Sequence, residues 1–214
     1  MVLVDSSGSI TEGEGNADNF DLVKSFITSL VDDIDDRSPV GDRTRIGVLS
    51  YSNKVNTDVE LADNLNADEI ATEVNDIEYQ GSVTKMYEAV TRARSTLFDP
   101  ATQRPGVVVT KAVVLFTDGV PHTDDKRERS ETFANVMRVL NDLMDNEVFV
   151  VIVGVNNYNE TMLKLVSQND FGFAFTTEEF EGLQNPTFPD MIAESLELNC
   201  SKLSHVENIV VVFK

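Results

Sequence analysis

Short apolar runs recur along the chain and alternate with segments whose apolar residues repeat at helical spacing. Residues 112–116 (AVVLF) and 148–153 (VFVVIV) contain no polar residue, which is typical of strands that are buried on both faces. In residues 20–34 and 133–144 the apolar positions fall on one side of a helix. This alternation predicts an α/β fold with a doubly wound, mostly parallel central sheet and amphipathic helices on both of its faces.

One pair of strands departs from this parallel pattern. Residues Ile46–Tyr51 and Val55–Leu61 flank Ser52-Asn53-Lys54, a polar link short enough for a hairpin. We therefore expect one antiparallel edge strand in an otherwise Rossmann-like sheet. The other predicted strands are Val2–Val4 and Phe171–Phe175, and the other predicted helices are Ala67–Ile77, a helix from near Thr84 to Leu97, Met162–Ser167 and Pro189–Leu196.

The domain boundaries follow from the same pattern. Residues 1–197 are predicted to form a single domain, and 198–214 a C-terminal extension whose β-like run Ile209–Phe213 has no predicted place in the sheet. Met1–Val4 resembles the middle of a buried strand, so we expect the natural chain to begin earlier. Asp18 or Asn19 is a candidate cap for the first long helix.

The charge balance restricts the classes of partner. The chain has 17 Lys and Arg against 37 Asp and Glu, a net charge of −20. This acidity argues against binding to nucleic acid, whose affinity for proteins depends on basic residues. No apolar run approaches the roughly 20 residues needed to span a bilayer. The acidity favours cations, basic partners or a mineral surface, or it serves only to keep the protein soluble.

Oxygen-bearing side chains gather in three separated segments, each at the end of a predicted strand or the start of a helix. Asp5, Ser7 and Ser9 follow the first strand, Thr84 opens a helix, and Asp118 follows the run 112–116. The carboxyl ends of strands in an open parallel sheet line one crevice, where distant residues converge. Gly8 allows a tight turn that points three side chains toward one centre.

The chemistry of these side chains predicts the ion. Two carboxylates and three hydroxyls form an all-oxygen, partly charged set that suits Mg²⁺ or Mn²⁺ better than Ca²⁺, which usually takes more carboxylates and carbonyls. A water on such an ion can be exchanged for an oxygen of a partner. As alternatives, DSSGS is also a common helix-capping turn, and Thr84 alone is also a common N-cap.

The same residues resemble a known family. The run Val2–Ile10 (VLVDSSGSI) resembles the Asp-x-Ser-x-Ser signature of von Willebrand factor type A domains and integrin inserted domains. Residues 79–84 (YQGSVT) are similar to the second motif of the family, and residues 115–119 (LFTDG) to its third. The order and rough spacing match from residue 1 to about 197.

The resemblance implies a metal-ion-dependent adhesion site and a binding function without covalent chemistry. Ser7, Ser9 and sometimes Thr84 would contact the ion directly, whereas Asp5 and Asp118 would often act through waters. In adhesive members a carboxylate of the partner completes the shell. Two positions depart from the family pattern, since Ser82 and Met86 stand where the second motif usually has a glycine and a threonine.

The leading interpretation is an extracellular adhesion or matrix-binding module, with a protein, collagen-like or mineral ligand. The sequons Asn159-Glu160-Thr161 and Asn199-Cys200-Ser201 favour a secreted glycoprotein. An acidic biomineral matrix protein and an intracellular assembly module are the alternatives. A metal-dependent phosphohydrolase is disfavoured, because the chain has no phosphate-binding Gly-x-x-x-x-Gly-Lys motif and carries Ser7 where a second carboxylate would be needed beside Asp5.

Overall fold

The computed structural model describes all residues except 12–17, 120–125, 157, 203–207 and 212–214. Its strands are β1 (Val2–Asp5), β2 (Val48–Tyr51), β3 (Val55–Val59), β4 (Val109–Thr117), β5 (Val148–Val155), β6 (Gly172–Thr177) and β7 (Asn208–Val211). Its α-helices are α1 (Asn19–Arg37), α2 (Ala67–Asn75), α3 (Met86–Phe98), α4 (Lys126–Asp145), α5 (Glu160–Ser167) and α6 (Thr187–Lys202). Short 3₁₀ helices are η1 (Gly8–Thr11), η3 (Pro100–Thr102) and η4 (Phe180–Gln184).

The strands form one sheet in the order β3-β2-β1-β4-β5-β6, and β7 pairs with β4 beside this path. The pairing of β2 with β3 is antiparallel, whereas the other strand pairs are parallel. The predicted α/β class, the mostly parallel sheet and the antiparallel edge strand are therefore confirmed. In the part of the chain that is described, no helix is long and apolar enough to cross a membrane.

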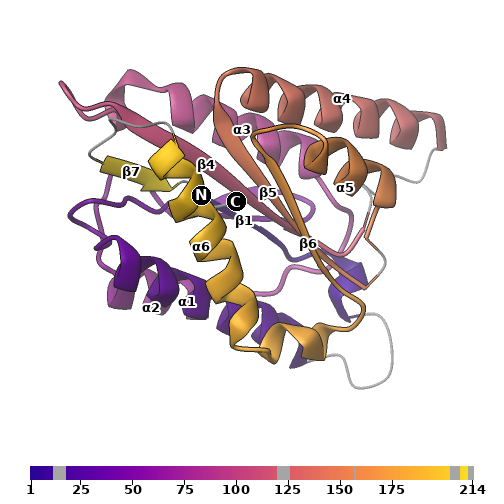
Figure 1. Cartoon of the computed structure of the whole chain (residues 1–214). Coiled ribbons are helices and arrows are strands. Elements are labelled where there is room, and N and C mark those ends of the chain that lie inside the picture. The colour runs from indigo at the N-terminus through magenta and orange to yellow at the C-terminus, as the bar shows by residue number, and fades with distance from the viewer. Residues whose placement is uncertain (12–17, 120–125, 157, 203–207, 212–214) are drawn as a thin grey trace.

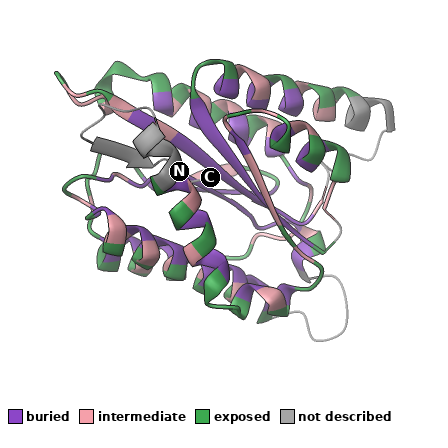
Figure 2. Cartoon of the chain, viewed as in Figure 1, coloured by how far each residue is buried: buried purple, intermediate pink, exposed green. Residues whose placement is uncertain are grey.

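Helices cover both faces of the sheet (Figure 1). On one face α1 packs against α2 and α6, and on the other α3 packs against α4. The side chains of each central strand alternate between these layers, so that Val2 and Val4 join the core beneath α1 whereas Leu3 joins the core beneath α3. The sheet is consequently buried through its centre (Figure 2).

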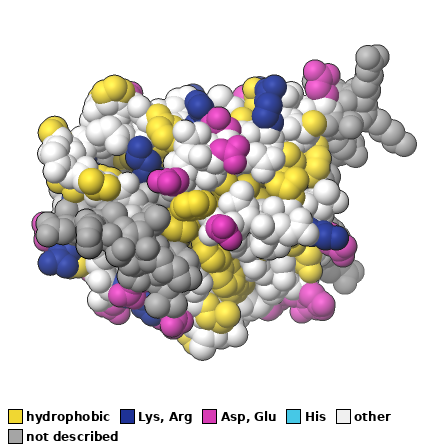
Figure 3. Space-filling model, turned by 45° about the horizontal axis from the view of Figure 1, so that its top comes forward, with side chains coloured by type: hydrophobic (Ala, Val, Ile, Leu, Met, Phe, Trp, Pro, Cys, Tyr) yellow, Lys and Arg dark blue, Asp and Glu magenta, His cyan; other side chains and the backbone are white. Residues whose placement is uncertain are grey.

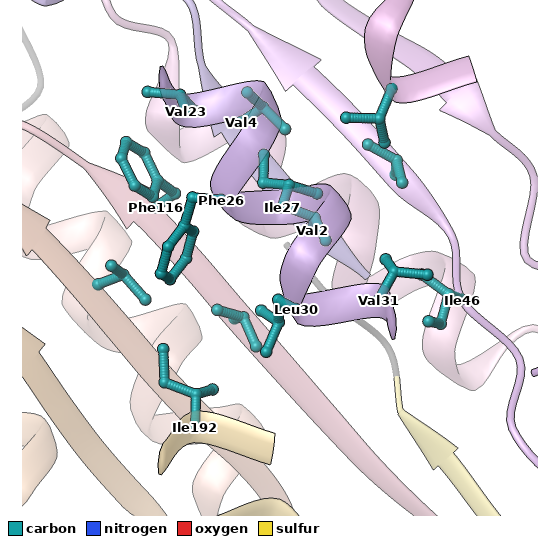
Figure 4. Packing of buried hydrophobic residues seen from close by; sticks show 14 of the residues in the cluster. Val2, Val4, Val23, Phe26, Ile27, Leu30, Val31, Ile46, Phe116 and Ile192 are labelled. Carbon is teal, nitrogen blue, oxygen red and sulfur yellow. The ribbon is translucent and has the colours of Figure 1, made fainter. Parts of the chain in front are cut away.

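The helical stripe predicted for residues 20–34 forms the centre of the first core. In α1 the buried residues include Val23, Phe26, Ile27, Leu30 and Val31. They face side chains of the sheet and of α6 (Figure 4). Burial of five such side chains stabilises the fold by roughly 1.5–3 kcal/mol each, as an upper estimate. This packing fixes α1 across the sheet.

The ends of several elements differ from the predicted ends. The helix expected near Thr84 begins at Met86, because the Lys85 amide donates to the Ser52 carbonyl at 2.9 Å and ties this segment to the loop after β2. Asp18 is the N-cap residue of α1, but it makes no side-chain capping bond among the described residues. Asn19 instead donates from Nδ2 to the Ile10 carbonyl at 2.9 Å.

The β-like run near the C-terminus has a place in the sheet. Strand β7 lies parallel to β4, with Asn208 opposite Val109 and Val211 opposite Ala112. Because β5 occupies the other side of β4, β7 lies on the same side as β1, which pairs with residues 114–116 of β4. The two strands thus follow one another along one edge of β4. The domain boundary at residue 197 stays a prediction, and α6 continues across it to Lys202.

Candidate metal centre

Two of the five predicted ligands meet at the carboxyl edge of the sheet. Asp5 is the last residue of β1, and Asp118 directly follows the last residue of β4. The parallel register places Val4 opposite Phe116, so the two strands reach this edge together. Both aspartates are buried, with 0% of Asp5 and 4% of Asp118 exposed. The topology therefore brings two carboxylates together in the protein interior.

The loop that carries Thr84 is tied to the loop that follows β1. The Gly8 amide donates to the Ser82 carbonyl at 2.9 Å, and the Gly81 amide donates to the Ser6 carbonyl at 3.0 Å. Ser52 also contacts the loop that carries Thr84, since its hydroxyl lies within hydrogen-bond distance of the carbonyls of Gly81 (3.2 Å) and Val83 (3.1 Å). The Thr84 segment of the predicted site is thereby held against the segment that carries Asp5, Ser7 and Ser9.

The hydroxyls of the predicted ligands lie between the interior and solvent. The Ser7 amide donates to Asp5 Oδ1 at 3.0 Å, a turn in which the aspartate fixes the backbone two residues on. Ser7 Oγ lies 3.2 Å from Ser9 Oγ. Ser7 is fully buried, Thr84 is buried and Ser9 is exposed. The predicted centre is thus closed behind Asp5 and opens to solvent at Ser9.

Burial and charge act together on Asp5. Its burial, and then the neighbouring charge of Asp118, raise the pKa of Asp5 from 3.8 to about 7, although hydrogen bonds from Ser7 and Tyr51 oppose the shift. Two buried carboxylates disfavour each other's ionised form. A divalent cation between them would favour that form, because it supplies the opposite charge. The electrostatics of the pair therefore fit a bound cation.

The donor set fits the ion class expected from the sequence. Asp5 and Asp118 supply carboxylates, and Ser7, Ser9 and Thr84 supply hydroxyls. Within the described residues there is no group of three or more His, Cys, Asp or Glu placed to hold a metal. A carboxylate-rich calcium cage and a thiolate or imidazole zinc site are therefore not found there, whereas a mixed carboxylate and hydroxyl set is compatible with Mg²⁺ or Mn²⁺.

Two supporting residues were not predicted from the sequence. Tyr51 is fully buried, as a packing residue would be. It also lies beside Asp5, whose pKa its hydroxyl lowers, while that hydroxyl donates to the Phe116 carbonyl at 3.0 Å. Thr117 Oγ1 lies 3.4 Å from Asp5 Oδ2. The position of Thr117 next to Asp118 could have indicated that it lies near the site. Nothing in the sequence around Tyr51 indicates that it lies beside Asp5.

The two departures from the family motif have different structural consequences. Ser82 has a φ of 122°, a backbone conformation that favours glycine. A serine there strains the loop before Thr84. Met86 is fully buried in the core beneath α3, so the side chain that replaces the usual threonine serves packing. The candidate ligands themselves are all retained.

Comparison with known proteins identifies the family of the chain. The sequence model of the von Willebrand factor type A domain matches residues 1–188. The chain belongs to the von Willebrand factor type A domain family.

Similar proteins include matrix proteins of the mouse, Mus musculus. The collagen alpha-4(VI) chain is 30% identical over 186 residues, which cover 86% of this chain and 7% of the collagen chain. Matrilin-2 is 30% identical over 137 residues, which cover 63% of this chain and 14% of matrilin-2. The chain thus spans only a small part of the length of these relatives.

The fold is shared with a solved structure, proximal thread matrix protein 1 from the mussel byssus, with a zinc-occupied MIDAS motif. That structure superposes with a TM-score of 0.71 at 23% sequence identity, covering 90% of this chain and 46% of that chain. The similarity confirms the Rossmann-like arrangement.

Proposed function

We propose that the chain is a divalent-cation-dependent adhesion or extracellular matrix-binding module. The observation that carries the proposal is the convergence of three dispersed segments at one edge of the sheet. There the buried Asp5 accepts a hydrogen bond from the Ser7 amide, and the Ser7 hydroxyl lies next to that of the exposed Ser9. The family relatives among the collagens and matrilins support a role in the matrix.

The proposed centre consists of Asp5, Ser7, Ser9, Thr84 and Asp118, with Mg²⁺ or Mn²⁺ preferred to Ca²⁺. The hydroxyls of Ser7, Ser9 and Thr84 would bind the ion, and the two aspartates would balance its charge and orient its waters. The ion, when bound, would act as a Lewis acid to which an oxygen of the partner coordinates. The exposed position of Ser9 gives a partner carboxylate access to this side of the centre. Binding of this kind needs no covalent step, so we propose no enzymatic activity.

Thermal unfolding with added ions tests the proposal. We expect Mg²⁺ or Mn²⁺ at about 100 times the Kd to raise the Tm by about 5–10 °C, because a ligand of the native state stabilises it by mass action. Asp5→Ala and Asp118→Ala should abolish the rise. Asp58→Ala, which removes a half-buried carboxylate from another part of the sheet, is the matched control and should retain it. An unchanged Tm of the unaltered protein with every divalent ion contradicts the proposal.

Extracellular localisation belongs to the proposal and has a separate test at Asn159. Asn159 caps α5, since its Oδ1 accepts from the Met162 amide at 2.9 Å. We expect a glycan at this residue when the protein is made in its own organism. Thr161→Ala is the control that destroys the sequon while retaining the cap, because Thr161 is exposed. An unmodified Asn159 would favour the intracellular assembly module.

A second candidate function, an acidic biomineral matrix protein, is favoured by one surface feature. Asp32, Asp35, Asp36 and Asp68 line a hollow of about 360 Å³ between α1 and α2. Burial and the neighbouring aspartates raise the pKa of Asp32. On the face in Figure 3, however, acidic and basic side chains are interspersed among the described residues. Weak multisite Ca²⁺ binding that survives Asp5→Ala would support this candidate over the leading one.

A further inference from the structure

The hydroxyl of Tyr79 links the two loops of the candidate metal centre. Tyr79 Oη donates toward the carbonyl oxygens of Ser7 at 3.3 Å and Gly8 at 3.4 Å. Both carbonyls belong to the turn that carries the Ser7 and Ser9 hydroxyls. Tyr79 itself lies in the loop that leads to Thr84, five residues before it. A single side chain therefore spans from the second motif to the first.

The ring of Tyr79 contacts two neighbours. It packs against Phe20 in the first turn of α1, with ring centroids 5.6 Å apart. It also lies close to Gly81, where an added Cβ would stand 3.3 Å from the ring carbon Cε1. Gly81 also has a φ of 56°, so this position favours glycine both for its backbone and for its contact with the ring. The hydroxyl is thus presented from a fixed ring.

Two backbone bonds flank this side-chain link. The Gly8 amide donates to the Ser82 carbonyl at 2.9 Å and the Gly81 amide to the Ser6 carbonyl at 3.0 Å. Together with Tyr79 Oη they join the turn after β1 to the loop before α3. Hydroxyl ligands bind an ion more tightly when supporting bonds already hold them in the binding arrangement, because less ordering remains to be done on binding.

We propose that Tyr79 is a positioning residue for cation binding, which holds the Ser7–Ser9 turn against the Thr84 loop through its hydroxyl. The inference rests on the proposed function. It assigns a binding role to Tyr79, a residue that is 39% exposed and whose sequence position indicates only packing. The hydroxyl contributes to ion affinity, and the ring contributes to folding.

The substitution Tyr79→Phe separates these two contributions, because it retains the ring and removes the hydroxyl. In titrations with Mg²⁺ alone and Mn²⁺ alone we expect the Kd to rise about five-fold, the effect of one lost hydrogen bond. Amide exchange of Gly8, measured by NMR with a chelator present, should become faster. The Tm in chelator should change no more than in Tyr158→Phe, a control at another tyrosine that is half-buried against the core beneath α3.

The outcomes distinguish this inference from the proposed function. If the unaltered chain binds Mg²⁺ or Mn²⁺ and Tyr79→Phe binds with the same Kd, Tyr79 has no positioning role while the metal centre stands. An equal weakening in Tyr158→Phe overturns the inference as well. If the unaltered chain binds neither ion, the proposed function fails and the inference fails with it.

Discussion

Two carboxylates of the sheet, the fully buried Asp5 at the end of β1 and the half-buried Asp58 in the edge strand β3, lie in different chemical surroundings. Burial is the largest cause of a raised pKa in both. Both oxygens of Asp5 have partners, the Ser7 amide and Thr117 Oγ1. Asp58 Oδ1 accepts from Ser50 Oγ at 3.2 Å, whereas the buried Oδ2 has no hydrogen-bond partner among the described residues.

The two carboxylates differ in the groups that surround them. Near Asp58, the side-chain amides of Asn56 and Gln80 both donate to Ser50 Oγ, which donates in turn to Asp58. Asn56, Asp58 and Gln80 line a polar hollow of about 550 Å³, which Glu73 also borders. Near Asp5, by contrast, a second aspartate and several hydroxyls converge from three segments. The candidate centre at Asp5 is therefore distinguished from the Asp58 hollow by a second buried carboxylate, Asp118, whose charge acts on Asp5.

The largest expected effect is the change in the free energy of unfolding with pH that Asp5 contributes when a chelator is present. Its pKa is about 7 in the folded protein against 3.8 for an unperturbed aspartate. A raised pKa contributes stability that is fully present below pH 3.8 and is lost as the pH rises toward about 7. At about 1.4 kcal/mol per pKa unit, the loss in the free energy of unfolding is about 4 kcal/mol. Denaturant unfolding between pH 4 and 8 measures it.

The variant Asp5→Asn isolates this contribution. The substituted side chain cannot ionise. The free energy of unfolding of the variant should therefore exceed that of the unaltered protein at pH 8 and approach it at pH 4. Saturating Mg²⁺ should remove the advantage of the variant at pH 8, because the ion stabilises only the chain with the ionised carboxylate. If the free energies of unfolding of the two proteins change with pH in parallel, the pKa of Asp5 is not raised by folding.

A smaller effect is expected for Asp58→Asn. Burial, reinforced by the charge of Glu73, raises the pKa of Asp58, so its stabilising contribution is present in acid and lost as the pH rises through the folded pKa. The substitution removes the charge and replaces an unpartnered acceptor with a donor. We expect a gain of about 1 kcal/mol at pH 8 and none in acid. Unlike Asp5→Asn, this variant should retain the full stabilisation by Mg²⁺, and a loss of that response would contradict the separation of the two sites.

The smallest effect is expected for Ser82→Gly. The φ of 122° at Ser82 costs about 1–3 kcal/mol in a residue with a side chain. Glycine relieves this strain but adds freedom to the unfolded chain, so we expect a net gain of up to about 1 kcal/mol in chemical denaturation. Asn64→Gly, at a φ of 56°, is the control and should gain less, because asparagine adopts this region readily. No residue that lines the Asp58 hollow has a positive φ.

The sequence was sufficient for those parts of the fold and the candidate site that depend on local pattern. The runs 112–116 and 148–153 lie inside β4 and β5, because strands buried on both faces must be apolar throughout. Asp5 and Asp118 lie at the predicted edge, since the carboxyl ends of parallel strands line one edge of the sheet. The use of all five residues as ligands stays a prediction.

Features that depend on distant partners were not predictable. Tyr51 reaches the Phe116 carbonyl across 65 positions of the sequence, and Tyr79 reaches Ser7 across 72. Neither pairing changes the local pattern of the chain, so each tyrosine looks like a packing residue. The run near Ile209 had no predicted place for the same reason, because its partner is the amino-terminal half of β4.

The position of β7 has a consequence for association between molecules. Residues 109–112 of β4 would present unpaired backbone amides and carbonyls along one side if β7 were displaced. An uncovered strand edge of this kind can template pairing with a strand of another molecule. Strand β7 covers this edge of β4, and it comes from the opposite end of the sequence from β1, which covers residues 114–116 of the same strand.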